Sequence, residues 1–224
     1  METFIPIDVV TGGPGSGKSD LLAEADRQFG PEAVRLGRIE RPKLMIIPEG
    51  ATILINGGYP MPCRRFPWSQ RWQDRFEQVN YFIHLNMERE IVRRARRAGC
   101  LFALADRSRR DILAYFRGDK KRYQKACGID PDDVLGDYAE VILMETLATV
   151  DPEEYERIRR TRDTHRMERA SRAVELDGFM REAWAGFRPL HSIPCMSSAD
   201  EKIQYGIRLI AERIRKLEEA ARSL

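Results

Sequence analysis

A glycine-rich stretch near the start of the chain constrains its fold more than any other feature. Residues 12–19 read Gly-Gly-Pro-Gly-Ser-Gly-Lys-Ser, which fits the phosphate-binding loop pattern G-x-x-x-x-G-K-[ST]. Glycines let successive backbone N–H groups turn inward around a phosphate, because no Cβ stands in the way. Lys18 is expected to reach the β- and γ-phosphates and the Ser19 hydroxyl to bind Mg²⁺. The pattern therefore predicts a nucleoside triphosphate site.

The flanking residues have the context that this loop requires, a buried strand before it and a helix after it. Residues 7–11 are apolar and β-branched except for Asp8, and Leu21, Leu22 and Ala25 recur at helical spacing between residues 19 and 28. A chance glycine-rich turn would lack both neighbours. The predicted nucleotide-binding residues are Gly12, Gly13, Pro14, Gly15, Ser16, Gly17, Lys18, Ser19 and Asp20.

The chain as a whole predicts one domain over residues 1–224. It has 224 residues, of which 42% are hydrophobic, enough to fill one core. No apolar run is long enough for a membrane span, and the first predicted strand begins too early to leave room for a signal peptide, so we expect a cytoplasmic protein. The four cysteines form no C-x-x-C pair and predict free thiols rather than a zinc site or disulfides.

Apolar runs of strand length alternate with helical patterns along the chain. Strands are predicted at residues 7–11, 44–47, 101–105, 138–144 and 191–193, and helices at 19–28, 51–55, 70–97, before Trp184 and at the C-terminus. This alternation predicts an α/β fold with a parallel sheet covered by helices on both faces. The long helix is expected to bury a stripe that consists of Trp72, Phe76, Val79, Ile83, Met87 and Ile91. The stripe of the last helix, from Ile203 to Leu217, could serve the core or a homodimer.

Two carboxylates follow predicted strands at the edge where ligands of parallel sheets bind. Asp106 is assigned to Mg²⁺, together with Ser19, and Glu49 to the acceptor side, where it would take a proton from an attacking hydroxyl. The alternatives are a helix N-cap for Asp106 and a surface turn carboxylate for Glu49.

A charged segment between residues 149 and 172 is interpreted as a lid. It contains seven arginines, namely Arg157, Arg159, Arg160, Arg162, Arg166, Arg169 and Arg172. Some can pair with neighbouring glutamates on a solvated helix. The others could neutralise charge as a phosphoryl group moves, and Arg166 is the first candidate for that role.

Several other function classes are disfavoured by what the sequence lacks. Arg107 follows Asp106, so the Asp-Glu pair of motor ATPases is missing, and no guanine-reading motif follows, which favours ATP over GTP. The basic cluster at residues 93–97 has no interleaved aromatic residues, so nucleic acid is not the expected partner. Trp68 and Trp72 either flank the mouth of a pocket or are part of the hydrophobic core.

The motifs together resemble the NadR-like P-loop ATPase/kinase family. The resemblance rests on residues 10–19, on Pro-Glu-Gly-Ala-Thr at 48–52, on Ala-Asp-Arg-Ser at 105–108, on Val-Ile-Leu-Met-Glu-Thr at 141–146, and on shorter matches at 166–168 and 176–177. It implies an AAA-type, kinase-like P-loop fold related to thymidylate and nucleoside kinases, with ATP, Mg²⁺ and an arginine-bearing lid. By this match Glu49 lies on the acceptor side and Asp106 and Arg107 beside the phosphates. Asp20 and Cys195 depart from the family pattern.

These observations predict a small-molecule kinase that acts on a nucleoside- or nucleotide-like hydroxyl. Its expected partners are ATP and an unidentified acceptor, and no association with a membrane is expected. The predicted catalytic residues are Lys18, Glu49, Asp106, Arg107 and Arg166. The alternative is a nucleotide-dependent ATPase or switch that acts through a protein partner. A nucleic-acid end kinase is a third interpretation.

Overall fold

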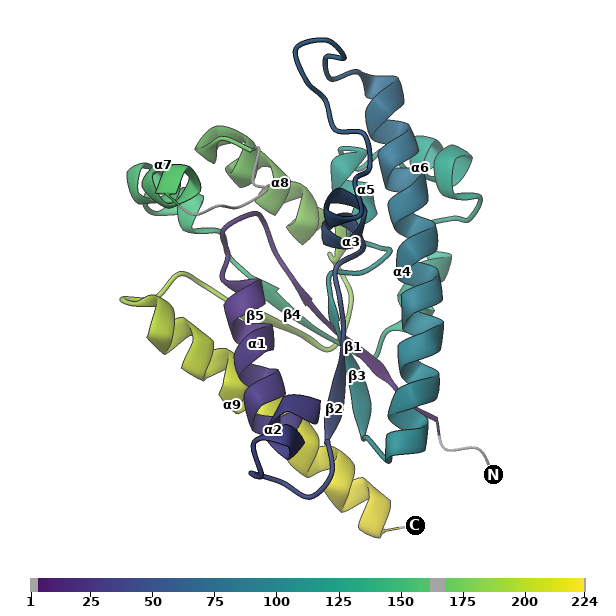
Figure 1. The fold of residues 1–224 in the computed structure, drawn as a ribbon, viewed down its shortest axis with the longest axis vertical. Coiled ribbons are helices and arrows are strands. Elements are labelled where there is room, and N and C mark those ends of the chain that lie inside the picture. The colour runs from purple at the N-terminus through teal and green to yellow at the C-terminus, as the bar shows by residue number, and fades with distance from the viewer. Residues whose placement is uncertain (1–3, 162–167, 224) are drawn as a thin grey trace.

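The computed structural model describes residues 4–161 and 168–223, which build a five-stranded parallel sheet between two layers of helices (Figure 1). The strand order is β2-β3-β1-β4-β5. The strands are β1 (Ile7–Thr11), β2 (Leu44–Ile47), β3 (Phe102–Asp106), β4 (Glu140–Met144) and β5 (Leu190–Ile193). All five predicted strands are present, and the predicted fold class is confirmed.

The helices and strands alternate as the sequence pattern indicates. The helices are α1 (Lys18–Phe29), α2 (Pro31–Arg35), α3 (Gly50–Asn56), α4 (Gln70–Ala98), α5 (Ile112–Tyr115), α6 (Lys120–Cys127), α7 (Pro152–Thr161), α8 (Ala170–Ala183) and α9 (Ala199–Arg222). Ser69 caps α4 by accepting the Trp72 N–H, and Gly99 ends it in the left-handed conformation. Both chain ends lie at the lower end of the molecule, opposite α7 and α8 (Figure 1).

The register brings the carboxyl ends of all five strands to one edge. Val10 of β1 lies opposite Asp106 of β3, and Ile47 of β2 lies opposite Ala105. On the other side of β1, Thr11 lies opposite Leu143 of β4, and Met144 of β4 lies opposite Ile193 of β5. The segments that follow the strands therefore meet at this edge, where ligands of open α/β sheets bind.

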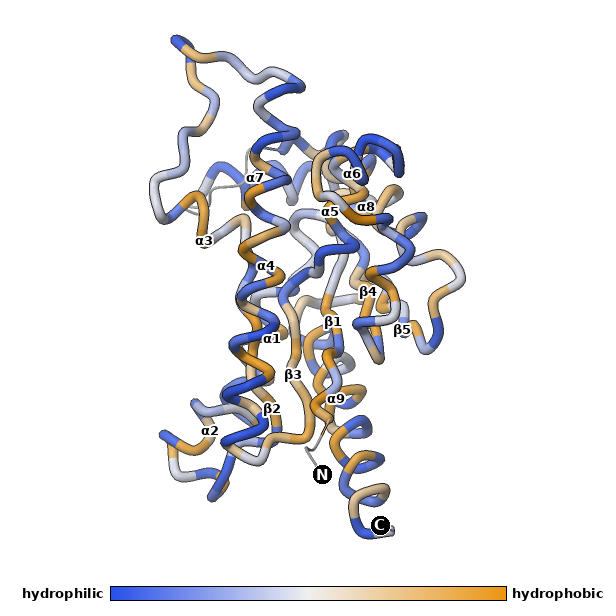
Figure 2. Tube along the Cα trace, turned by 90° about the vertical axis from the view of Figure 1, so that its right-hand side faces the viewer, coloured by the Kyte–Doolittle hydropathy of each residue, from blue (hydrophilic) through white to orange (hydrophobic). Residues whose placement is uncertain are grey.

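Each face of the sheet carries its own hydrophobic cluster, because side chains alternate along a strand. Val9 and Ala103 face the cluster that α4, α5 and α6 complete. Val10 and Leu104 face the opposite cluster, which α1 and α9 complete. Hydrophobic residues accordingly run along the strands, whereas hydrophilic residues follow the outer turns of the helices (Figure 2).

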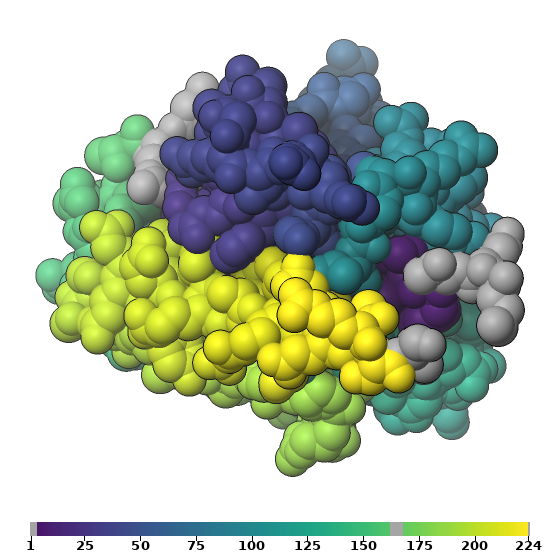
Figure 3. All heavy atoms as spheres, turned by 90° about the horizontal axis from the view of Figure 1, so that it is seen from below, coloured from purple at the N-terminus to yellow at the C-terminus, as the bar shows by residue number. Residues whose placement is uncertain are grey.

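The apolar stripe of α9 packs inside the protein. Ile207, Ile210 and Ile214 are buried against the sheet, with Ile203 and Leu217 at the margin of the same cluster. Figure 3 shows α9 lying alongside the α1–α2 region across the lower face. The stripe of α9 therefore belongs to the core. It gives no support to a homodimer through α9, which stays a prediction.

The predicted buried stripe of α4 is only partly right. Phe76 is buried, but Val79, Ile83, Met87 and Ile91 are half-buried. The most buried positions include four polar residues, which are Glu77, Asn80, His84 and Glu88. The helical period was correct, but a scale of hydrophobicity alone cannot find a buried polar face. Among the described helices none has the length and apolar character needed to cross a membrane.

A buried ion pair at the lower part of the sheet predicts a pH dependence of stability. Burial raises the pKa of Asp8 to about 6 from 3.8, although Arg213 donates to its carboxylate at 2.9 Å; nearby Glu140 also raises the pKa, whereas His191 lowers it. Because the folded pKa is the higher one, protonation of Asp8 favours the folded state. This contribution is complete below about pH 4 and is lost as the pH rises through about 6.

We therefore expect the unfolding free energy of the wild type, relative to the non-titrating Asp8→Asn variant, to fall by about 2–3 kcal/mol between about pH 4 and pH 7. Urea unfolding of both proteins over this range measures the difference. A difference that stays constant with pH would contradict the prediction, whatever the mean stability of the variant.

Candidate active site

A cavity of about 670 Å³ opens at the carboxyl edge of the sheet. The phosphate-binding loop contributes Pro14, Gly15, Lys18 and Ser19 to its wall. The segments after β2 and β3 contribute Glu49, Asp106 and Arg107. Residues from α4 and from the start of α8 close the other sides. The structure thus brings together predicted residues that lie far apart in the sequence.

The loop has the backbone that a phosphate nest requires. Gly12, Gly15 and Gly17 have φ angles of 140°, 76° and 90°, in a region that side chains with a Cβ rarely adopt. α1 begins directly at Lys18, so its unpaired N–H groups and positive dipole end point toward the cavity. The sequence pattern therefore predicted this geometry correctly.

Lys18 is buried at the base of the loop. Its Nζ donates to the carbonyls of Gly12 and Gly13, both at 3.0 Å, and to the Ser16 hydroxyl at 3.1 Å. Burial and the neighbouring Arg107 lower the pKa of Lys18 to about 7, and the nearby carboxylates oppose this shift. An anionic phosphate would restore the ordinary charge of the amine, so this lysine is prepared for such a ligand.

Asp177 of α8 holds the loop from the outside, a role that the residue pattern did not predict. Its Oδ1 accepts the backbone N–H groups of Gly13, at 2.9 Å, and of Thr146, at 3.1 Å. A Cβ on Gly13 would lie 2.9 Å from the Asp177 Cβ, so glycine permits this approach. The Thr146 hydroxyl also donates to the Pro14 carbonyl. The available signal was the match to the family pattern at residues 176–177, which did not indicate this contact.

Glu49 and Arg107 form an ion pair at the cavity wall. Arg107 Nε donates to Glu49 Oε1 at 2.6 Å, and the Thr52 hydroxyl donates to the other carboxylate oxygen at 2.6 Å. Burial alone would raise the pKa of Glu49, but Arg107, Thr52 and Lys18 hold it below its usual value. Arg107 has a φ of 66°, a strained conformation that a folded protein retains where its surroundings impose it. The predicted surface-turn alternative for Glu49 is wrong.

Asp106 lines the same cavity. It ends β3, and α5 begins only after Asp111, so the N-cap alternative is wrong. Its Oδ1 is buried without a hydrogen-bond partner in the part of the chain that the structure describes. Burial, reinforced by Glu49, raises the pKa of Asp106 to about 7, against the opposing effect of Lys18. A carboxylate held in this way favours a positively charged ligand.

The family model that matches the chain is described as an AAA domain and covers residues 8–205. The chain belongs to this AAA domain family. Its intact phosphate-binding loop makes it a nucleotide-binding P-loop protein. A solved structure from Chloroflexus aurantiacus, described as a "putative kinase", is similar to it with a TM-score of 0.45 and 15% identity, over 91% of this chain and 97% of that one. No curated protein matches. The NadR-like specificity stays a prediction.

AAA and other P-loop proteins imply Mg²⁺ beside the triphosphate, and the residues present fit it. Within residues 4–161 and 168–223 no cluster of three or more His, Cys, Asp or Glu side chains could hold a metal alone. Mg²⁺ needs no such cage, since it takes one or two protein oxygens in addition to phosphates and waters. Ser19 lines the cavity, and the Asp106 Oδ1 lacks a partner. These two side chains are the predicted pair.

The lid residues of this AAA domain are only partly placed. Residues 149–161 form the end of a 3-10 turn and α7, where Arg157 and Arg159 pair with Glu154 and Glu156. Arg169 and Arg172 line the cavity, and Arg172 also pairs with Glu175. Arg166 and Arg162 lie outside the described residues, so the lid and the role of Arg166 stay predictions.

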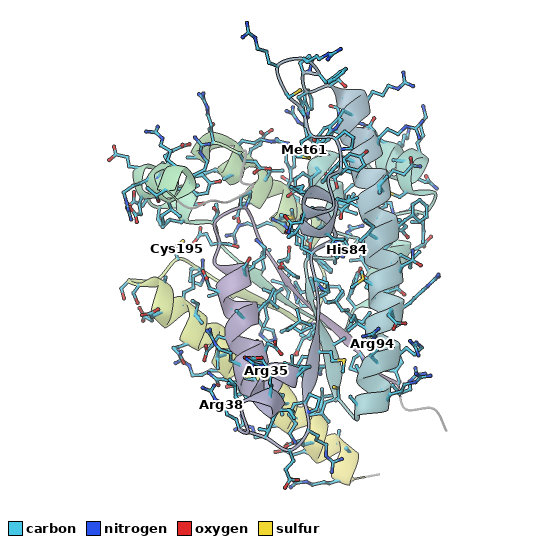
Figure 4. The ribbon with its side chains drawn as sticks, viewed as in Figure 1. Arg35, Arg38, Met61, His84, Arg94 and Cys195 are labelled. Atoms are coloured by element: carbon cyan, nitrogen blue, oxygen red, sulfur yellow. The ribbon has the colours of Figure 1, made fainter. Side chains whose placement is uncertain are left out.

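Asp20 is exposed and does not line the cavity, unlike Lys18 and Ser19 in the same helical turn. Cys195, which departs from the family pattern, lies beyond β5 toward α9, on the other side of the site from His84 and Met61 (Figure 4). Its N–H donates to Glu145 at 2.9 Å. All four cysteines are free, as predicted.

The polar face of α4 is the part of the site that sequence reasoning missed. His84 Nε2 accepts the N–H of Gly50, the residue after Glu49, at 3.1 Å. Burial lowers the pKa of His84 to about 4, so the imidazole is neutral and serves as this acceptor. Asn80 and Glu77 line the cavity about one and two turns before it, respectively. Trp68 and Trp72 line it as well, which confirms the pocket-mouth interpretation.

Proposed function

We propose that this protein is a small-molecule kinase that transfers the γ-phosphoryl group of ATP to a hydroxyl of a nucleoside- or nucleotide-like acceptor. The observation that carries the proposal is the shared cavity, in which Lys18 and the phosphate-binding loop face the Glu49–Arg107 pair. The cavity then continues to the aromatic side chains of α4. A site that binds only a triphosphate would not need this additional part of the cavity, which is lined by aromatic side chains.

The proposed reaction uses each group according to its position. The loop N–H groups and Lys18 hold the triphosphate and stabilise charge on the transferring group. The acceptor oxygen bonds to the γ-phosphorus as the bond to the bridging oxygen breaks, ADP leaves, and the hydroxyl proton passes to Glu49. Arg107 orients Glu49, and Arg169 and Arg172 add positive charge from α8. Mg²⁺, held by Ser19 and Asp106, would supply further charge neutralisation at the phosphates.

The Glu49→Gln variant tests the acceptor side of this proposal. We expect phosphoryl transfer to fall about 100-fold or more, because the glutamine cannot accept the proton. The affinity for ATP should change little, since Glu49 is assigned to the acceptor. Transfer of label from γ-labelled ATP into a pool of nucleosides, nucleotides and small sugars measures the first quantity, and calorimetry with ATP measures the second.

Glu32→Gln is the matched control, because Glu32 also pairs with an arginine but lies on the surface of α2. Full transfer by Glu49→Gln would contradict the role of Glu49. Label that appears only as slowly released free phosphate, with no labelled acceptor, would favour the alternative of a nucleotide-dependent switch.

A further inference from the structure

The acceptor end of the cavity contains a buried carboxylate that forms no ion pair with any residue the structure describes. Glu77 is only 1% exposed and lines the cavity. Its two oxygens accept hydrogen bonds from amides, Gln73 Nε2 at 2.7 Å and Asn80 Nδ2 at 3.2 Å. Among the described residues no lysine, arginine or histidine forms an ion pair with it. A buried carboxylate that is hydrogen-bonded but not paired is costly, and a ligand can supply the missing charge.

A second atom at this end also lacks a partner. Asn80 is 4% exposed and lines the cavity, and its Oδ1 is buried without a hydrogen bond in the described part of the chain. The donation of Nδ2 to Glu77 determines the orientation of this amide, so Oδ1 is an acceptor. Both groups therefore present oxygen atoms that can accept hydrogen bonds at this end of the cavity. A complementary ligand brings N–H groups.

The walls around these groups are aromatic. The rings of Trp72 and Phe76 stack with their centroids 5.2 Å apart at 22°, and Tyr59 meets Phe76 edge-on at 5.3 Å. Trp72, Phe76 and the more exposed Trp68 line the cavity. Such a surface favours a flat ring, and the faces of these rings attract a cation.

The acidic group lies near the proposed phosphorylation point. α3 starts at Gly50 and is pressed against α4, because Gly50 N–H donates to His84 and a Cβ there would lie 2.5 Å from Asn80 Oδ1. Glu49 immediately precedes this contact, and Glu77 is close enough for the charges of Glu49 and Arg107 to influence it. A small molecule can therefore meet Glu49 with one end and Glu77 with another.

Building on the proposed kinase function, we propose that the acceptor is a ring-bearing amino alcohol, whose hydroxyl meets Glu49 and whose protonated amine meets Glu77 and Asn80. Glu77 is then a specificity-determining residue. Burial raises the pKa of Glu77 to about 7 in the protein alone, and an ammonium group beside it would favour the ionised form. The ligand would thus supply an ion-pair partner that the described residues do not.

Matched pairs of acceptors test this proposal on the wild-type protein. Each pair has the same ring and hydroxymethyl group and differs in a second substituent that is an ammonium or a hydroxyl. Two pairs are 4-(aminomethyl)benzyl alcohol with 1,4-benzenedimethanol, and pyridoxamine with pyridoxine. We expect the amine of at least one pair to bind about 10- to 100-fold more tightly than its partner, from one charge-assisted hydrogen bond. Calorimetry with ADP present measures binding without any need for turnover.

Glu77→Gln should remove this preference, because the amide keeps the shape but loses the charge. Glu90→Gln, the same change on the exposed side of α4, should retain it. Absence of an amine preference in both pairs with the wild type, or its persistence in Glu77→Gln, would overturn the proposal. Transfer of label to a neutral acceptor would support the kinase function but contradict the proposal that the acceptor is an amine. Binding of the amine without any transfer of label would support the amine site but contradict the kinase function.

Discussion

Replacing Lys18 by alanine is expected to reduce phosphoryl transfer by about 100- to 1,000-fold, the largest loss of activity we foresee. Loss of one preorganised donor to a developing charge has effects of this size. Nζ lies against the loop carbonyls of Gly12 and Gly13, 3.0 Å from each, at the base of the phosphate nest. No other lysine lines the cavity within the described residues.

The fold should tolerate this change, because the lowered pKa of Lys18 shows that burial of its charge is unfavourable without a phosphate. Transfer of label from γ-labelled ATP measures the activity, and circular dichroism checks the fold. Lys43→Ala, which breaks a surface ion pair with Glu218, serves as the control and should stay fully active. If Lys18→Ala retained more than about one tenth of the wild-type rate, the site would not act as assigned.

Replacing Gly12 by alanine should destabilise the protein by about 4 kcal/mol, the largest stability effect we expect. The backbone at Gly12 has a φ of 140°, and an added Cβ would lie 1.9 Å from the Met144 carbonyl oxygen. That oxygen belongs to β4, the strand beside β1, so neither backbone can move without disturbing the sheet. Urea unfolding measures the change in the unfolding free energy.

Gly178→Ala is the matched control for this variant. Gly178 lies within α8, and an added Cβ meets no atom within 4 Å. Because alanine is the better helix former, this variant should be more stable by roughly 0.5–1 kcal/mol. A loss below about 1 kcal/mol for Gly12→Ala would mean that the turn into the loop relaxes more easily than the close approach to Met144 indicates.

Most of the fold could be predicted because its signals are local. The loop at residues 12–19 predicts its own backbone conformation and the strand and helix beside it, and the structure confirms all three. The other strands are short apolar runs, which parallel sheets bury on both faces. The polar face of α4 could not be predicted, because segments distant in sequence cover it, as the contact between His84 and Gly50 shows.

The candidate site divides in the same way. Asp106 and Glu49 could be singled out because the first ends a strand and the second closely follows one, and in a parallel sheet all such ends meet at one edge. Their partners were beyond prediction from one sequence. The Glu49–Arg107 pair spans 58 positions, and Asp177 reaches Gly13 across 164. Arg166 was chosen from a run of arginines whose spacing cannot distinguish a solvated side chain from one in a site.

The sequence by itself determined that this protein binds a nucleotide at the edge of a parallel sheet. A phosphate nest needs only consecutive residues with the right backbone freedom, and one strand and one helix to hold them. Only the tertiary structure decided what surrounds the nest: the carboxylate from α8 behind it, the strained arginine beside Glu49, and the acidic, aromatic face of α4 opposite. The positions of these side chains depend on how segments distant in sequence pack together. Their pKa values are shifted by burial, and this burial exists only in the folded protein.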